Sequence, residues 1–178
     1  MVLGISLHAY TVVHALISFA AIASGIVVMR GLLTSRRMDG LTAFFLIMTA
    51  LTDITGLGFP LFTAQGEPFH GVTPGIRLAV ISLVALAIAI VARYPLHLEW
   101  RKTYVIATCA SLYFNFFVLV VQSFEKTPAL RAVAPTQKEA PFAIAQITLL
   151  LIFIGLTVLA AEIFHPEARA EAKLAQAA

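Results

Sequence analysis

The chain has few charged residues for its length. Only 12% of its 178 residues are charged and 60% are hydrophobic, whereas a soluble domain has about 25% charged and about 45–50% apolar residues. A soluble helical bundle keeps a polar stripe along each helix, but here charge-free runs cover residues 1–29, 78–92, 103–124 and 140–161. The composition therefore argues against a soluble globular domain.

Cysteine and catalytic motifs are also scarce. Cys109 is the one cysteine, which excludes disulfides within the chain, CxxC redox chemistry and thiolate metal sites. There is no HExxH, no nucleophile elbow and no Gly-rich phosphate loop preceded by a strand. The sequence predicts no catalytic residue and no metal site. The net charge of +3 comes from basic residues in short loops and does not indicate a nucleic-acid partner.

Long apolar runs dominate the rest of the sequence. They cover residues 5–31, 41–62, 76–94, 103–123 and 141–164, and each is close to the ~20 residues that span a bilayer core. We therefore expect an all-α, polytopic transmembrane bundle of five spans over residues 1–164, followed by a short solvated tail at 165–178. The first run lacks the flanks of a signal peptide, so we expect it to remain a membrane helix. The lipid bilayer is the first expected partner.

The basic residues predict how this bundle is oriented. With the N-terminus outside, eight of them fall on the inner side and four on the outer side. The inner set is Arg30, Arg36, Arg37, Arg93, Arg101, Lys102, Arg169 and Lys173, and the outer set is Arg77, Lys126, Arg131 and Lys138. The positive-inside rule favours this arrangement, with a cytoplasmic C-terminus. The short third run crosses only if Arg77 and Arg93 extend to opposite surfaces.

Four of the runs carry their most polar side chain at a similar depth. These side chains lie about 7–15 Å below the outer surface, counted at ~1.5 Å per residue. Polar and small residues also recur every three or four positions, so they share helix faces that should meet one another rather than lipid. The pattern predicts a ligand-binding pocket on the outer side. Its candidate residues are His14, Asp53, Asn115, Gln122, Gln146 and Arg77.

Asp53 is the residue most indicative of function. An acid near mid-bilayer costs about 2.5–3.5 kcal/mol on insertion scales, so it should be paired, hydrated or protonated. His14 and Arg77 are the expected partners in a structural pair. The alternative is a site for a ligand, an ion or a proton. Two glycines and Pro60 follow Asp53 and loosen the helix beside it, which favours that alternative.

The five histidines leave a haem site open. Ligation by two histidines would need imidazoles at one depth, which His14 with His70, or His97 with His165, could supply. A quinone needs only an apolar pocket with one or two hydrogen-bonding side chains, and it leaves no motif. The cofactor is therefore unknown, with haem or quinone as alternatives.

Three segments carry a resemblance to other membrane proteins. They are residues 52–60 (TDITGLGFP), 113–122 (YFNFFVLVVQ) and 134–142 (APTQKEAPF). Over most of its length the chain resembles a group of small uncharacterised bacterial polytopic inner-membrane proteins of no assigned function. The resemblance implies a bacterial source and the inner membrane, but no mechanism. It also implies an uncharged residue in relatives where this chain has Asp53, which would make Asn115 and Gln122 the safer site residues.

Three functions remain open from the sequence. The first is a non-catalytic component or accessory subunit of a membrane assembly, either a homo-oligomer or part of a larger complex, which the short loops and small-residue faces favour. The second is a small-molecule or ion transporter or binding protein that uses the pocket around Asp53. The third is a membrane redox protein or lipid-modifying enzyme that holds haem or quinone. An odd number of spans disfavours a transporter built from two inverted halves.

Overall fold

The computed structural model describes residues 6–63 and 74–166. Within these ranges there is no strand, and five of the six helices are long and apolar enough to span a bilayer. The helices are α1 (Leu7–Leu33), α2 (Asp39–Thr63), α3 (Pro74–Arg93), α4 (Arg101–Lys126), α5 (Pro128–Val133) and α6 (Ala140–Ile163). The all-α architecture with five candidate spans is confirmed. Most of the tail predicted at 165–178 lies outside the described residues.

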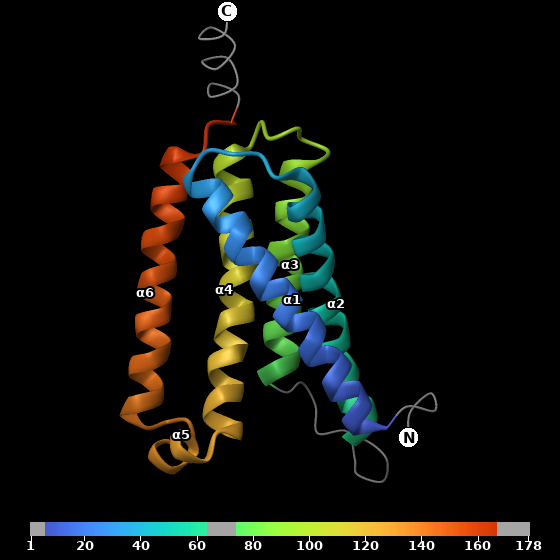
Figure 1. Ribbon diagram of the computed structural model, residues 1–178, viewed down its shortest axis with the longest axis vertical. Helices are drawn as coiled ribbons and strands as arrows, with labels where there is room; N and C mark the ends of the chain where they lie inside the picture. The colour runs from blue at the N-terminus through green and yellow to red at the C-terminus, as the bar shows by residue number, and fades with distance from the viewer. Residues whose placement is uncertain (1–5, 64–73, 167–178) are drawn as a thin grey trace, which may run out of the picture.

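The long helices run alternately in opposite directions (Figure 1). One end of the bundle holds the start of α1 and the short α5, and we call it the α5 end. The other holds the α1–α2 and α3–α4 connections and the end of α6, and we call it the Arg93 end because α3 finishes there. Successive helices pack as pairs, α1 with α2 and α3 with α4, and α4 also contacts α1, α2 and α6. α4 is therefore the central helix.

The local sequence explains where the helices begin. Ser6 caps α1, because its Oγ accepts a hydrogen bond from the Ala9 amide at 3.2 Å. Proline occupies the first turn of α3, α5 and α6, at Pro74, Pro128 and Pro141, where its missing N–H is not needed. The 27 residues of α1 extend about 40 Å at ~1.5 Å per residue, which exceeds the ~30 Å hydrocarbon core of a bilayer.

Small residues let α1 approach α2 and α4 closely. Gly25 is buried, and a Cβ atom there would clash with Leu112 of α4 and lie 2.8 Å from the Phe45 ring of α2. Ala21, one turn earlier on the same face, is also completely buried. The small-residue face predicted for the first span therefore lies against other helices, as expected.

α6 is the least buried of the long helices. Its buried residues are Phe153, Ala160 and Ala161, whereas large apolar side chains such as Ile147 and Leu151 are exposed. It packs on α4 and α1 and lies at one side of the bundle (Figure 1). An apolar face of this extent suits lipid or a second protein surface.

Candidate functional site

The predicted pocket residues lie on five different helices, and their burial differs. Asp53 of α2 and Asn115 of α4 are buried, and His14 of α1 is half-buried. Gln122 of α4 and Gln146 of α6 are partly exposed, and Arg77 in the first turn of α3 is exposed. In the structure, His14, Asn115 and Gln146 each form a contact between a different pair of helices.

His14 joins α1 to α2 near the α5 end. Its Nδ1 lies 2.7 Å from Thr55 Oγ1, and the neighbouring Tyr10 hydroxyl donates to the Thr55 carbonyl at 2.7 Å. Both rings pack edge-on against Phe59, with centroids 5.0 and 5.1 Å away. No hydrogen bond or ion pair links the described side chains of His14 and Asp53. The expected His14–Asp53 pair is therefore wrong, because Thr55 takes the position opposite the imidazole.

Asn115 joins α4 to α2 in the interior. Its Nδ2 donates to Thr49 Oγ1 at 3.3 Å and to the Ser111 carbonyl at 3.0 Å. Thr49 and Ser111 are completely buried, so the Asn115 amide is hydrogen-bonded to protein groups rather than to water. The polar faces predicted on α2 and α4 meet at this contact.

Asp53 has the least satisfied environment of the predicted residues. Asp53 is buried, with 8% of its surface exposed. Ser82 of α3 lies close enough to interact with its carboxyl group. No hydrogen bond of ordinary geometry joins them, and Asp53 Oδ2, Ser82 Oγ and Thr52 Oγ1 lack a partner among the described residues. Buried polar atoms without a partner are rare, and they usually bind a water molecule, an ion or a proton.

The two glutamines are engaged away from Asp53. Gln146 Nε2 donates to the Phe117 carbonyl at 3.3 Å and so connects α6 to α4. Gln122 Nε2 donates to Glu125 Oε2 at 3.3 Å on the same exposed stretch of α4. His14, Asn115, Gln122 and Gln146 thus each have a local partner in the structure. That these residues and Asp53 form one ligand-binding pocket stays a prediction.

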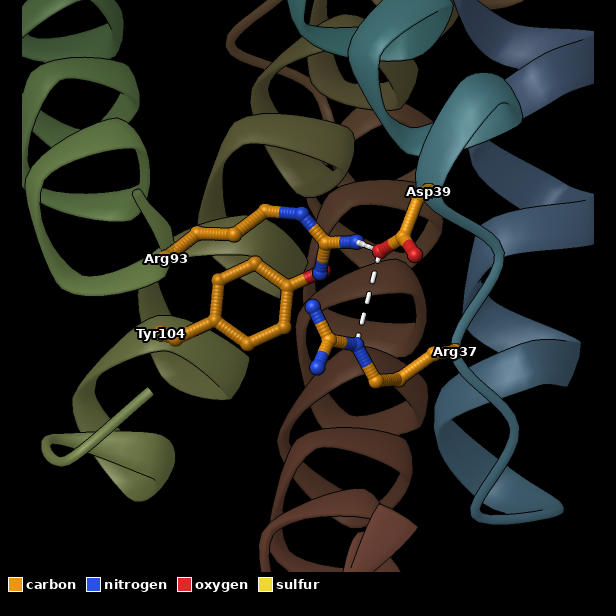
Figure 2. Close-up of polar contacts among 4 residues, drawn as sticks. All are labelled: Arg37, Asp39, Arg93 and Tyr104. Atoms are coloured by element: carbon orange, nitrogen blue, oxygen red, sulfur yellow. Dashed lines mark hydrogen bonds and ion pairs between the residues drawn. The ribbon is translucent and has the colours of Figure 1, made fainter. Parts of the chain in front are cut away.

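An ionic cluster around the buried Arg93 side chain was missed by the sequence analysis (Figure 2). Arg93 pairs with Asp39 at the start of α2, and its Nη1 donates to the Tyr104 hydroxyl at 2.9 Å. The guanidinium carbon lies 5.1 Å from the centre of the Tyr104 ring, and Arg37 adds an ion pair to Asp39 at 3.5 Å. We call Asp39, Arg93 and Tyr104 the Arg93 cluster. It ties α2, α3 and α4 together.

The Arg93 cluster corrects the expectation that Arg93 extends to the surface. Its side chain is only 2% exposed, whereas that of Asp39 is 66% exposed. A long basic side chain at a helix end either extends to water or pairs with an acid. Asp39 lies on the antiparallel neighbour at the same end of the bundle, which makes the pair possible. The sequence could have indicated this pair, because the start of the second span and the end of the third lie at the same end of the bundle.

A groove between α4 and α6 was also not predicted. It has a volume of about 440 Å³ and lies between Ile106, Ala110 and Tyr113 on one side and Leu150, Ile154 and Val158 on the other. At its Arg93 end, Lys102 Nζ forms an ion pair with Glu162 Oε1 at 2.6 Å. The buried thiol of Cys109 also borders it and contacts Met29 Sδ at 3.8 Å.

The described residues offer little for a metal or haem. Within residues 6–63 and 74–166 no group of three or more His, Cys, Asp or Glu side chains is placed to hold a metal ion. His97 and His165 are exposed at the Arg93 end, and His165 Nδ1 lies 3.2 Å from the Ile163 carbonyl. The His14–His70 alternative falls partly outside the described residues. Comparison with protein-family models, curated proteins and solved structures finds no match to this chain.

Proposed function

We propose that this chain is a multi-pass membrane protein that acts as a non-catalytic component of a membrane assembly. We further propose that it resides in the inner membrane of a bacterium, with its N-terminus outside and its C-terminus in the cytoplasm. The five long apolar helices support the membrane assignment. The distribution of basic residues supports the orientation, and the resemblance noted above supports the bacterial membrane.

The proposal rests mainly on the polar side chains of the helices, several of which form hydrogen bonds or ion pairs with a neighbouring helix. Asn115 binds Thr49, His14 binds Thr55, and Arg93 binds Asp39 and Tyr104. Each bond joins two helices, as polar groups do when they hold a membrane bundle together. Asp53 Oδ2, Ser82 Oγ and Thr52 Oγ1 depart from this pattern because they have no partner among the described residues, and the second candidate function below rests on them.

α6 is the surface best suited to an assembly partner. It packs on the bundle through few buried residues and exposes Ile144, Ile147 and Leu151. A second copy of the chain, or another membrane subunit, could pack against this face without disturbing the contacts of the other helices. We place the subunit contact there.

Cysteine cross-linking in native membranes tests the proposal. In a Cys109→Ala background, Ile147→Cys on α6 should form disulfide-linked species larger than the monomer, while the equally exposed Ile47→Cys on α2 should not. Native mass measurement after mild detergent extraction should show the same assembly. A monodisperse lone monomer with no cross-link from α6 would contradict the proposal.

A second candidate function rests on Asp53. Its buried carboxylate has an oxygen without a partner and faces Ser82, an arrangement that suits a bound proton or a small monovalent cation. Thermal unfolding at constant ionic strength tests this. Sodium, but not choline, should raise the melting temperature of the wild type and not of Asp53→Asn, with Glu125→Gln as the control acid. An equal response of Asp53→Asn would remove Asp53 from any ion site.

The haem or quinone alternative remains a prediction from the sequence. A Soret band in the purified protein would support haem, and extraction of a quinone in stoichiometric amount would support the other branch. A colourless preparation without extractable quinone would retire both.

A further inference from the structure

α4 and α6 are bonded to each other at both ends of the groove between them. At the Arg93 end, Arg101 donates to the Phe164 carbonyl next to the Lys102–Glu162 pair. Towards the α5 end, Gln146 bonds to the Phe117 carbonyl. α4 and α6, which lie side by side in Figure 1, are thus joined at two levels.

Aromatic side chains form the floor of the groove. Phe153 is buried, and its ring centre lies 5.6 Å from that of Tyr113 and 5.5 Å from that of Phe116. The walls are almost wholly aliphatic, and Ala110 adds little bulk to the α4 side. The volume of about 440 Å³ falls within the ~300–1,000 Å³ of typical ligand pockets. The shape is that of an apolar slot along the helix axes.

Charge is confined to one end of this slot. Lys102 and Glu162 line it there, and Arg101 lies close enough to act electrostatically on Glu162. The two cations and one acid leave a net charge of +1. A lysine ammonium has three N–H donors and an arginine guanidinium has five, so donors remain after the bonds to Glu162 and the Phe164 carbonyl. This end can therefore take one further anionic group.

We propose that the α4–α6 groove binds an anionic glycerophospholipid, with an acyl chain in the apolar slot and the phosphate at Lys102 and Arg101. The inference rests on the proposed membrane insertion. A single phosphodiester with no cation of its own matches the net charge of +1. A zwitterionic headgroup would add an ammonium, but the acid that could receive it already pairs with Lys102.

Aromatic residues at the same end support this placement of the headgroup. Tyr94 and Trp100 are exposed on the α3–α4 connection, close in sequence to Arg101. Tyrosine and tryptophan gather at the level of lipid headgroups in membrane proteins. The charged end of the groove therefore belongs at headgroup level, and the slot extends from there toward the bilayer centre.

Native mass spectrometry of the full chain in detergent, titrated with phosphatidylglycerol, tests the proposal. The double variant Arg101→Gln/Lys102→Gln should bind this lipid at least about tenfold more weakly, because charge-assisted hydrogen bonds to the phosphate are lost. The matched control Lys126→Gln at the α5 end should bind as the wild type does. Ala110→Phe should fill the slot and reduce binding, whereas Ala23→Phe on the exposed side of α1 should not.

Three outcomes would overturn the lipid site. The first is equal binding by the wild type and the double variant. The second is equal affinity for phosphatidylethanolamine, and the third is full competition by inorganic phosphate, which would indicate an anion site without a chain slot. Circular dichroism of each variant checks that the helices persist. Extraction by alkaline carbonate tests membrane insertion separately, so loss of the lipid site with an inserted chain leaves the proposed function standing.

Discussion

Two acids of α2 have contrasting surroundings. Asp39 begins the helix, is mostly exposed, and pairs with the buried Arg93. Asp53 lies about 21 Å further along the helix at ~1.5 Å per residue, and it is buried beside Ser82 with an oxygen that has no partner among the described residues. In the first case the cation is buried and the acid neutralises it. In the second the acid itself is buried, and no described cation pairs with it. Burial alone therefore does not distinguish these two acids, whereas the presence of a charged partner does.

Asp39→Asn gives the largest expected effect. It leaves the guanidinium of Arg93 buried without a counter-charge, and removing one partner of a fully buried ion pair costs about 3–5 kcal/mol. The Asp39 side chain is 66% exposed, so water screens the pair, and the Tyr104 hydroxyl still accepts from Arg93. We therefore expect about 2 kcal/mol, between the values for exposed and buried pairs. SDS titration of the protein in mixed micelles measures the free energy of unfolding. Stability equal to that of the exposed Glu125→Gln control would contradict the role given to Asp39.

Asn115→Ala tests an uncharged contact between α4 and α2. It removes the bonds to Thr49 and Ser111, and side-chain hydrogen bonds in membrane bundles contribute about 0.6–1.7 kcal/mol. We expect a loss of about 1 kcal/mol by the same unfolding measurement. Thr49→Val should account for most of this loss, and a double variant no less stable than either single one would confirm the pair. No loss in either single variant would place the amide outside the contact.

Asp53→Asn should differ in sign from Asp39→Asn. It removes a carboxylate that has an oxygen without a partner, so the unfolding free energy should stay level or rise by up to about 1 kcal/mol, since an unsatisfied buried group costs about 1–3 kcal/mol. Conversion to the amide keeps the size of the side chain. A loss as large as that of Asp39→Asn would show that Asp53 has a counter-charge and would break the comparison.

An exposed acid supplies the smallest effect. Glu139 precedes α6 outside the candidate spans. Desolvation raises the pKa of its carboxyl group, but hydrogen bonds from the Thr136 hydroxyl and from the Thr136 and Lys138 amides outweigh this, so the pKa lies below its usual value. A lowered folded pKa gives stability above the usual glutamate pKa, which is lost as the pH falls through the folded value. The melting temperature of the wild type should exceed that of Glu139→Gln at neutral pH, and the difference should vanish in acid. A difference independent of pH would contradict this assignment.

The sequence predicted helices and their inward faces better than it predicted contacts. Runs of about 20 apolar residues define spans because the bilayer thickness sets their length. Periodic spacing placed Thr49, Asp53 and Asn115 on faces that the structure buries. The length of a span and the position of its polar face are both properties of a single helix, so the sequence of that helix is enough to predict them.

Contacts between helices depend on which neighbours pack together and at what rotation. The depth of His14 and Asp53 suggested one pocket, but depth does not tell which side chain lies opposite, and His14 lies opposite Thr55 in the structure. Arg93 was equally ambiguous, because extension to water and pairing with an acid both satisfy its charge. The α4–α6 groove arises from two helices held apart, which no local pattern encodes.

Paired double-mutant cycles test the contrast between the two acids most directly. The cycle of Asp39→Asn with Arg93→Met, followed by SDS unfolding, should give a coupling energy above about 1 kcal/mol, as expected for side chains in one buried network. The cycle of Asp53→Asn with Ser82→Ala should give a coupling near zero. Equal couplings in the two cycles, or a larger one at Asp53, would contradict the distinction between an acid that pairs with a buried cation and an acid without a charged partner among the described residues.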